Sequence, residues 1–170
     1  RAMLIQGLGP GQMLGELSRY STSVDGAFGA TAACVIVDRQ RSTLTFARAG
    51  HLPPLVAGSA GSRWLDDVVS PPLGVVPDRT VPEATVPVGH GEVVVMCSDG
   101  LVERRDEALD AGLDRLCRTV SAHLDEDVQD LADHLLAEMV GRAPTDDVVV
   151  VVKRLPAPDG DSGDSDDAAA

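Results

Sequence analysis

The sequence is poor in aromatic and basic residues. Only four aromatic side chains occur among its 170 residues, namely Tyr20, Phe28, Phe46 and Trp64. The 14 Lys and Arg residues stand against 27 Asp and Glu residues, which gives a formal net charge of −13. A chain this acidic repels phosphate backbones, and so few aromatics cannot form a base-stacking platform. We therefore expect no nucleic-acid partner.

Long apolar runs are also missing, and cysteines are few. No stretch approaches the ~18 apolar residues that a membrane-spanning helix needs. The three cysteines, Cys34, Cys97 and Cys117, are odd in number and far apart. This pattern favours small buried thiols in a reducing compartment over a disulfide framework. We expect no membrane span in this segment and a cytoplasmic location.

Length and composition suit one folded domain with a tail. Apolar residues make up 44% of the chain, enough for a buried core at this size. The residues after Pro156 hold five Asp and no Lys or Arg, so −5 of the net charge lies there. We assign a domain to residues 1–155 and an acidic disordered tail to 156–170. Because residues 2–8 open directly in an apolar helical pattern, we expect the chain to be part of a longer protein.

Hydrophobic spacing predicts strands in hairpin-like pairs and helices in consecutive pairs. Residues 43–48 alternate as in a half-exposed strand, whereas 93–97 lacks alternation and is typical of a central strand. This order favours antiparallel sheets packed with helices over a parallel sheet. The expected helices are about 11–21, 109–124 and 128–139. The expected strands are 32–37, 43–48, 85–88, 92–98 and 148–152, with a hairpin tip at 58–62 and a hairpin turn at Gly89-His90-Gly91.

Acidic residues flank the two most apolar predicted strands. Asp99 directly follows strand 92–98, and Gly100 lets the chain turn sharply there. Asp146 and Asp147 precede strand 148–152. If these strands are antiparallel neighbours, Asp99 and Asp146 converge at one sheet edge and attract a hard divalent cation. The alternative is that they are turn residues whose side chains bind nearby backbone N–H groups.

The histidines and serines favour no other chemistry. His51, His90, His123 and His134 lack the spacing of a zinc site, and no Gly-x-Ser-x-Gly elbow is present. We expect His123 and His134 to face solvent from helices. His51 lies on a constrained loop between Gly50 and two prolines, and it is the one histidine expected near a site.

Five short motifs, taken together, resemble one known family. In their order and approximate spacing they resemble the PPM (type 2C) metal-dependent protein phosphatases, and most closely the bacterial branch of the stage II sporulation phosphatase E (SpoIIE) and the RsbU-type stress regulators. The resemblance covers about residues 1–155. The motifs are Ala30-Thr31-Ala32, Ala49-Gly50-His51-Leu52-Pro53-Pro54-Leu55, Pro72-Leu73-Gly74, Ser98-Asp99-Gly100-Leu101-Val102-Glu103 and Asp146-Asp147-Val148.

The resemblance implies an α/β (α+β) sandwich of two antiparallel β-sheets flanked by helices. It also implies hydrolysis of phosphoserine or phosphothreonine by a water held between two Mn²⁺ or Mg²⁺ ions, with no protein nucleophile. By their motif positions, Asp99 and Asp146 match metal ligands. Gly100, His51 and Asp147 are expected to shape the site.

In this family the other metal ligands come earlier in the chain, at positions before Arg1 of this sequence. One of their motifs is Gly-His-Gly, but Gly89-His90-Gly91 lies between two later strands and is not its counterpart. We therefore expect an N-terminally truncated domain that lacks its first strands and is inactive alone. The longer parent is expected to be a serine/threonine phosphatase acting on an anti-anti-sigma-factor-like regulatory protein in bacterial signalling, with sensor or regulatory domains in the same chain. The alternative is an inactive phosphatase-fold module used for partner binding or autoregulation.

Overall fold

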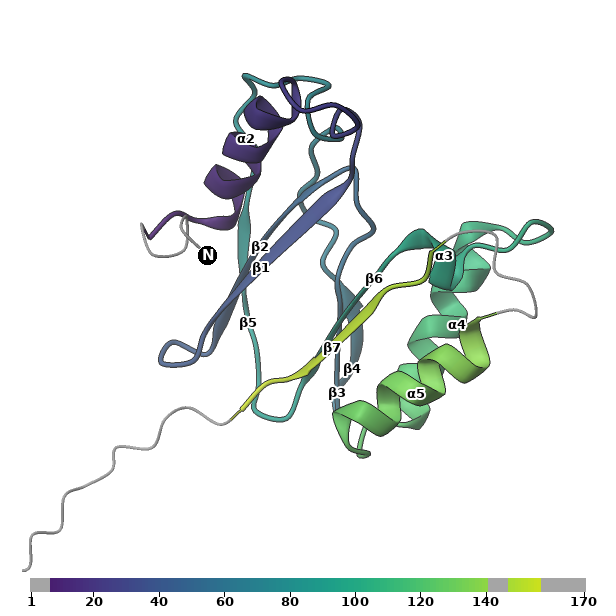
Figure 1. The fold of residues 1–170 in the computed structure, drawn as a ribbon. Coiled ribbons are helices and arrows are strands. Elements are labelled where there is room, and N and C mark those ends of the chain that lie inside the picture. Colours follow the sequence, from purple (N-terminus) through teal and green to yellow (C-terminus); the bar gives the residue numbers. More distant parts are fainter. Residues whose placement is uncertain (1–6, 141–146, 157–170) are drawn as a thin grey trace, which may run out of the picture.

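The computed structural model describes residues 7–140 and 147–156 (Figure 1). The predicted helix over 2–8 and the acidic tail fall almost entirely outside these ranges. The helices are α2 (Pro10–Ser21), α3 (Asp99–Val102), α4 (Leu109–Ala122) and α5 (Val128–Met139). The strands are β1 (Ala32–Asp38), β2 (Thr43–Ala49), β3 (Leu55–Gly58), β4 (Gly61–Trp64), β5 (Ala84–Pro87), β6 (Val93–Cys97) and β7 (Val150–Arg154).

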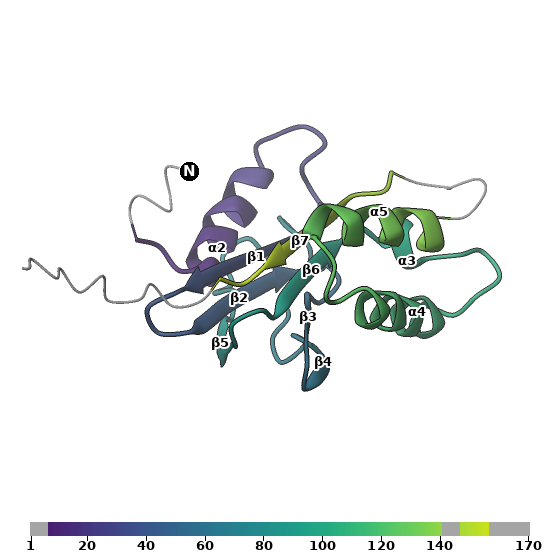
Figure 2. The same ribbon diagram turned by 90° about the horizontal axis from the view of Figure 1, so that it is seen from below.

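Two antiparallel sheets lie between layers of helices. Sheet A has the order β1-β2-β5, and sheet B has the order β4-β3-β6-β7. Helix α2 packs on sheet A, while α4 and α5 pack on sheet B (Figure 1). Helices α4 and α5 lie side by side as a hairpin (Figure 2). The predicted sandwich of two antiparallel sheets flanked by helices is therefore confirmed.

Strand β6 contributes to the apolar core on both faces of sheet B. Val94 faces sheet A, where it joins a cluster with Leu44 and Phe46 of β2. Val93 and Val95 face the helices and join the cluster that contains Leu116 and Leu131 among its members. Because successive strand residues point to opposite faces, an unbroken apolar run fits a strand covered on both sides. The prediction of a central strand here is confirmed.

Strand β2 is more covered than its alternation predicts. Leu44 and Phe46 are fully buried between the sheets, as expected. On the opposite face, however, Ala47 and Ala49 are each 1% exposed and pack with Leu14 of α2. The expectation of a half-exposed strand is therefore wrong for its second half. Alanine is small and only weakly hydrophobic, so the sequence of β2 gives little indication that a helix covers this face.

The segment Gly89-His90-Gly91 is a crossover between the sheets, so the predicted hairpin is wrong. Strand β5 pairs with β2 in sheet A, and β6 pairs with β3 and β7 in sheet B. Hydrophobic spacing identifies strands but not their partners. Glu92 secures the crossover because it accepts hydrogen bonds from Gly89 N at 2.8 Å and from both terminal nitrogens of Arg63 on β4 at 2.7 and 3.0 Å.

One packing contact between helices admits only glycine. A Cβ atom on Gly112 of α4 would lie 2.1 Å from the carbonyl oxygen of Val102 in α3. Helix α4 can therefore approach α3 this closely only because position 112 has no side chain. Arg115 of α4 reinforces the approach, since it donates to Val102 O at 3.4 Å and to both carboxylate oxygens of Glu107, in the loop between the helices, at 2.7 Å.

No helix among the described residues combines the length and the apolar character that a membrane crossing requires.

Replacing Glu92 with Gln should lower the melting temperature at neutral pH, since the amide loses the charge that Arg63 binds. The hydrogen bond from Arg63 holds the pKa of Glu92 below its ordinary value. The stabilisation is therefore present above the pKa of an unfolded Glu, about 4.3, and is lost as the pH falls through the lower folded value. Melting followed by circular dichroism should show the gap between wild type and Glu92→Gln narrowing as the pH falls below about 4.3. Asp67→Asn, in an exposed loop, is the control, and a gap that does not narrow with falling pH would contradict this role.

Substituting Ala at Gly112 should destabilise the fold by about 1–3 kcal/mol, because the new methyl group overlaps backbone that cannot move freely. The matched control is Gly15→Ala in α2, where a Cβ atom would meet nothing within 4 Å. That change should be neutral or stabilising by up to about 1 kcal/mol, owing to the better helix propensity of Ala. Urea unfolding of both variants measures the difference, and equal stabilities would refute the packing argument.

Candidate active-site pocket

Strands β6 and β7 meet at the edge where the predicted acidic residues lie. They pair antiparallel, with Cys97 opposite Val150, so the end of β6 and the start of β7 share that edge. Ser98 closes the junction. Its N–H donates to Val149 O at 2.9 Å, its Oγ donates to Asp147 O at 3.0 Å, and the same Oγ accepts from Val149 N at 2.9 Å.

This junction brings the backbone of Asp147 beside the residue that precedes Asp99. Asp146, the second predicted ligand, lies outside the described residues. Asp147, the next residue in the sequence, is exposed. The pairing that the convergence argument assumed is thus present, and the ligand roles of Asp99 and Asp146 stay predictions.

Asp99 opens the one-turn helix α3, which the sequence pattern did not predict. Asp99 is exposed, and its Oδ1 accepts a hydrogen bond from Gly100 N at 2.8 Å. This local bond is the turn-type contact expected under the alternative interpretation, but it uses one carboxylate oxygen only. The chain does turn here, from β6 into α3, but Gly100 lies inside α3 and is not in the left-handed region, so the turn does not depend on a left-handed glycine. A four-residue helix has too little periodicity to be recognised in sequence.

Arg48 organises the loop that carries His51. From the end of β2, its guanidinium group donates to three backbone carbonyls, those of Val68 at 2.9 Å and of His51 and Asp66 at 3.2 Å. Arginine suits this role because its planar fork of donors can reach several acceptors at once. The network joins the His51 loop to residues 66–68. No sequence motif indicated it.

Gly50 is required by the conformation of this loop. Its φ angle is +66°, and a Cβ atom would lie 2.6 Å from Cγ of Pro72. Its N–H donates to Ser70 O at 2.7 Å. The Gly50-His51 motif therefore packs directly against the Pro72-Leu73-Gly74 motif. Leu73 in turn donates its N–H to Ala30 O at 2.9 Å, which brings in the motif around Thr31.

The motif segments enclose a small pocket of about 220 Å³. The structure thus brings His51, Gly50 and Asp99 together although they are distant in sequence, and it adds Thr31 and Glu103. His51 Nδ1 lies 3.0 Å from Leu52 O, which places the proton on Nδ1 and leaves Nε2 as an acceptor. The residues that line the pocket are Thr31, Gly50, His51, Leu52, Ser98, Asp99 and Glu103.

The donor groups of the pocket suit a hard divalent cation. Asp99 and Glu103 contribute carboxylates, and Thr31 and Ser98 contribute hydroxyl groups. Within the described parts of the chain, neither carboxylate forms an ion pair with Lys or Arg. Oxygen-rich donors without a cationic partner are what Mg²⁺ and Mn²⁺ prefer. The residues present therefore fit such an ion.

The cysteines offer no nucleophile. All three are free, and burial raises the pKa of each thiol, to about 11 for Cys97. They are therefore protonated at neutral pH and unreactive. Only Cys97 is fully buried, while Cys34 and Cys117 are partly exposed, so the expectation of three buried thiols holds in part.

Two other histidines, His123 and His134, lie side by side. Their rings stack with centroids 3.9 Å apart. The His123 side chain is only 19% exposed, so the expectation that it faces solvent is wrong, whereas the His134 side chain is 44% exposed. With Glu126 the two histidines form a group whose potential ligand atoms all lie within 4.8 Å of one another. The absence of zinc-like spacing therefore does not exclude a ligand set that includes these two histidines. A search for short zinc-like spacing misses residues that a helical hairpin brings together.

Comparison with known proteins places this architecture in a family. Residues 1–156 match the family model described as stage II sporulation protein E (SpoIIE). The phosphoserine phosphatase RsbP of Bacillus subtilis is 23% identical over 141 residues, which cover 80% of this chain and 34% of RsbP. The chain spans about a fifth to a third of the length of the curated relatives it matches.

Solved structures share the fold. The RsbU and RsbW domains of a Mycobacterium tuberculosis protein superpose with a TM-score of 0.81 at 23% identity, covering 93% of this chain and 46% of that one. The phosphatase domain of SpoIIE from Bacillus subtilis gives 0.62 at 21% identity, covering 78% and 60%. With the family model matched from residue 1 to residue 156, the chain belongs to the SpoIIE family of PP2C-like phosphatases, as its motifs indicated.

Proposed function

We propose that the parent of this chain is a metal-dependent serine/threonine phosphoprotein phosphatase, and that the Asp99 pocket is part of its active site. The observation that carries the proposal is the convergence of separate motif segments on one pocket at the β6–β7 edge. His51 and Asp99 belong to different motifs that are far apart in the sequence, yet they line the same small cavity. Membership of the SpoIIE family supports this chemistry.

Asp99 and Asp146 would hold the cations, two Mn²⁺ or Mg²⁺ ions in the complete domain. When bound, such ions make a water molecule nucleophilic and neutralise the charge of the phosphate. The N–H of Gly100 holds Oδ1 of Asp99 and so orients the carboxylate. Ser98 fixes the backbone at Asp147 and Val149, where the chain enters β7.

His51 would position a reactant at the pocket wall. Because Nδ1 donates to Leu52 O, Nε2 can accept a hydrogen bond from a water or from a hydroxyl group of the substrate. Arg48 and Gly50 act indirectly, since they fix the loop that places the imidazole. No side chain of the pocket is needed as a nucleophile, in keeping with the protonated thiols.

The domain assigned to residues 1–155 would be completed by preceding residues of the parent. Val149, just before β7, is 58% exposed, and Val151 on β7 is 54% exposed. Val151 pairs with Met96, so it faces the same side of sheet B as Val94, which belongs to the cluster between the sheets. Apolar residues of that side are normally covered. Further strands from the parent would cover them and bring the remaining metal ligands, while 156–170 would form an acidic tail.

The substrate would be a phosphoserine or phosphothreonine on a regulatory protein of the anti-anti-sigma-factor type in the bacterial cytoplasm. Two relatives support this class. RsbP is named a phosphoserine phosphatase, and the solved Mycobacterium tuberculosis structure joins an RsbU domain to an RsbW domain. Sensor or regulatory domains in the same parent would control the reaction.

Replacing Asp99 with Asn in the full-length parent should reduce Mn²⁺-dependent phosphate release from a phosphoserine protein by on the order of 100-fold or more, because a metal ligand loses its charge. The amide can still accept from Gly100 N, so the fold should be kept. Asp146→Asn should behave in the same way. Phosphate release is measured against Mn²⁺ concentration for each protein, with melting temperature as a check on folding.

Asp114→Asn, on the exposed side of α4, is the matched control and should retain full activity. A parent without activity, or one indifferent to both substitutions in the pocket, would contradict the phosphatase assignment. The inactive binding module would then be the better description.

A further inference from the structure

We propose that the α4–α5 hairpin carries a separate site for one transition-metal ion of the Zn²⁺ class, held by His123, Glu126 and His134. The site lies away from the Asp99 pocket. Strand β7 runs from the pocket edge at Val150 to Arg154, which contacts the α4–α5 turn (Figure 1). The two locations are therefore at opposite ends of sheet B.

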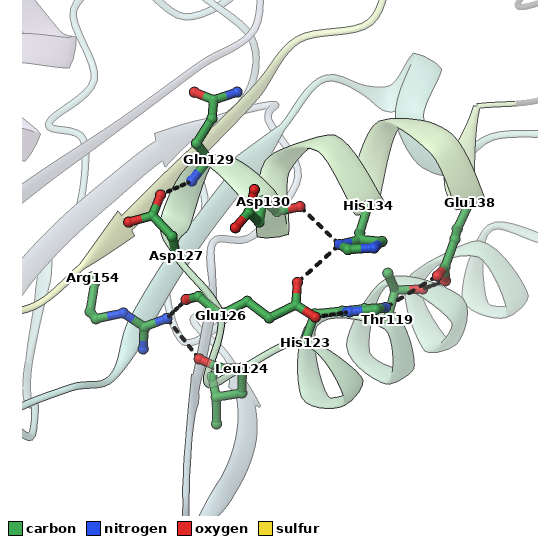
Figure 3. Close-up of polar contacts among 10 residues, drawn as sticks. All are labelled: Thr119, His123, Leu124, Glu126, Asp127, Gln129, Asp130, His134, Glu138 and Arg154. Atoms are coloured by element: carbon green, nitrogen blue, oxygen red, sulfur yellow. Dashed lines mark hydrogen bonds and ion pairs between the residues drawn. The ribbon is translucent and has the colours of Figure 1, made fainter.

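The three side chains come from both helices and the turn between them. His123 caps the C-terminus of α4, Glu126 lies in the turn, and His134 lies on α5. Figure 3 shows all three pointing toward one another. Glu126 is central, with Oε1 2.9 Å from His123 Nδ1 and Oε2 3.0 Å from His134 Nδ1.

One carboxylate oxygen is incompletely paired. Oε2 of Glu126 is closed off from solvent, although the Glu126 side chain as a whole is 38% exposed. The donor beside it, His134 Nδ1 at 3.0 Å, also lies 3.0 Å from Asp130 O and is shared between the two acceptors. An anionic oxygen that shares its donor is weakly satisfied, and a cation beside it would complete the pairing.

The surroundings resemble the outer shell of a metal site. On the far side of the His123 ring, Nε2 lies 3.2 Å from Oε1 of Glu138. Oε2 of Glu138 in turn accepts from Thr119 Oγ1 at 3.0 Å. Metal-binding histidines commonly donate their second ring nitrogen to a carboxylate in this manner, which fixes the ring and raises its basicity.

The turn that presents Glu126 is anchored to the sheet. Arg154 on β7 donates through Nη2 to the backbone carbonyls of Leu124 and Glu126, both at 2.7 Å (Figure 3). Its Nη1 donates to Gly91 O at 3.1 Å. The carboxylate therefore projects from a turn that is held by strong charge-assisted bonds, which favours a preorganised site.

Two imidazoles and a carboxylate select a borderline metal rather than Mg²⁺ or Ca²⁺, which prefer oxygen donors throughout. In a tetrahedral Zn²⁺ site with bonds of about 2.0–2.1 Å, ligand atoms lie roughly 3.4 Å apart. The ligand atoms here lie within 4.8 Å of one another, and because the two imidazole planes are nearly parallel, at least one ring must rotate before both nitrogens face one ion. The nitrogen that binds the ion must be unprotonated, so any proton on it moves to the other ring nitrogen or to solvent. The bound ion would link the end of α4 to α5.

The purified chain should bind one Zn²⁺ ion in a calorimetric titration with ZnCl₂ in the presence of excess Mg²⁺, which occupies oxygen-only sites. Its melting temperature should rise by several degrees. Co²⁺, used as a spectroscopic probe, should give the intense visible absorption of a tetrahedral ion without a thiolate charge-transfer band. A thiolate band would overturn the assignment in favour of the cysteines.

Substitutions then locate the site. His134→Ala and Glu126→Gln should each weaken Zn²⁺ binding on the order of 100-fold, and Glu138→Gln by roughly 10- to 100-fold. Glu126→Gln keeps the size of the side chain and guards against a loss that is due to unfolding. His90→Ala removes an exposed imidazole in the sheet crossover and should bind as the wild type does.

The outcomes also separate this site from the proposed phosphatase centre. Zn²⁺ binding should persist in Asp99→Asn, whatever that substitution does to activity. If the wild type binds no Zn²⁺, or if binding survives both His134→Ala and Glu126→Gln, the proposal is overturned. The cluster would then be only an ion-pair network between His123 and its two glutamates.

Discussion

Ser98 makes three hydrogen bonds to the backbone that enters β7, and the arrangement of the candidate site depends on this junction. It fixes the edge at which β6 ends and β7 begins, and hence where Asp99 stands relative to Asp147. The same pairing sets Arg154 at the other end of β7, beside the α4–α5 turn. The position of β7 thus governs both regions in which charged side chains gather.

Around that junction, backbone contacts rather than side-chain contacts assemble the pocket. Arg48 binds three carbonyls, Gly50 binds Ser70, and Leu73 binds Ala30. Loops held in this way can carry functional side chains on a rigid scaffold. This role in holding the loops explains why apolar and glycine-rich segments, which have few reactive side chains, occur with Asp99 in the family's motif pattern.

Much of the fold could be predicted from sequence because the strands and helices have strong periodicity. The apolar run of β6 and the spacing of leucines in α4 and α5 depend on local patterns that burial enforces. The partner of β5 could not be predicted, since strands with similar composition can pair with either sheet. Helix α3 is too short for a periodic pattern, and the covering of Ala47 and Ala49 by α2 leaves little trace in small residues.

The candidate site shows the same division. Motif order placed His51 and Asp99 in one region, and the pocket they share fits that expectation, whereas Thr31 and Glu103 were not singled out as site residues. The carbonyl network of Arg48 and the stacked pair of His123 and His134 depend on tertiary contacts between segments without a shared motif. Such constellations are visible only once the chain is folded.

The central claim is that Asp99 is a metal ligand at the β6–β7 edge. The most direct measurement is a crystal structure of the full-length parent with Mn²⁺, in which anomalous scattering locates each ion. We expect an anomalous peak within bonding distance of the Asp99 carboxylate, with Asp146 on the same ion or its neighbour. Well-ordered Mn²⁺ bound elsewhere, with Asp99 hydrogen-bonded only to its own turn, would contradict the account.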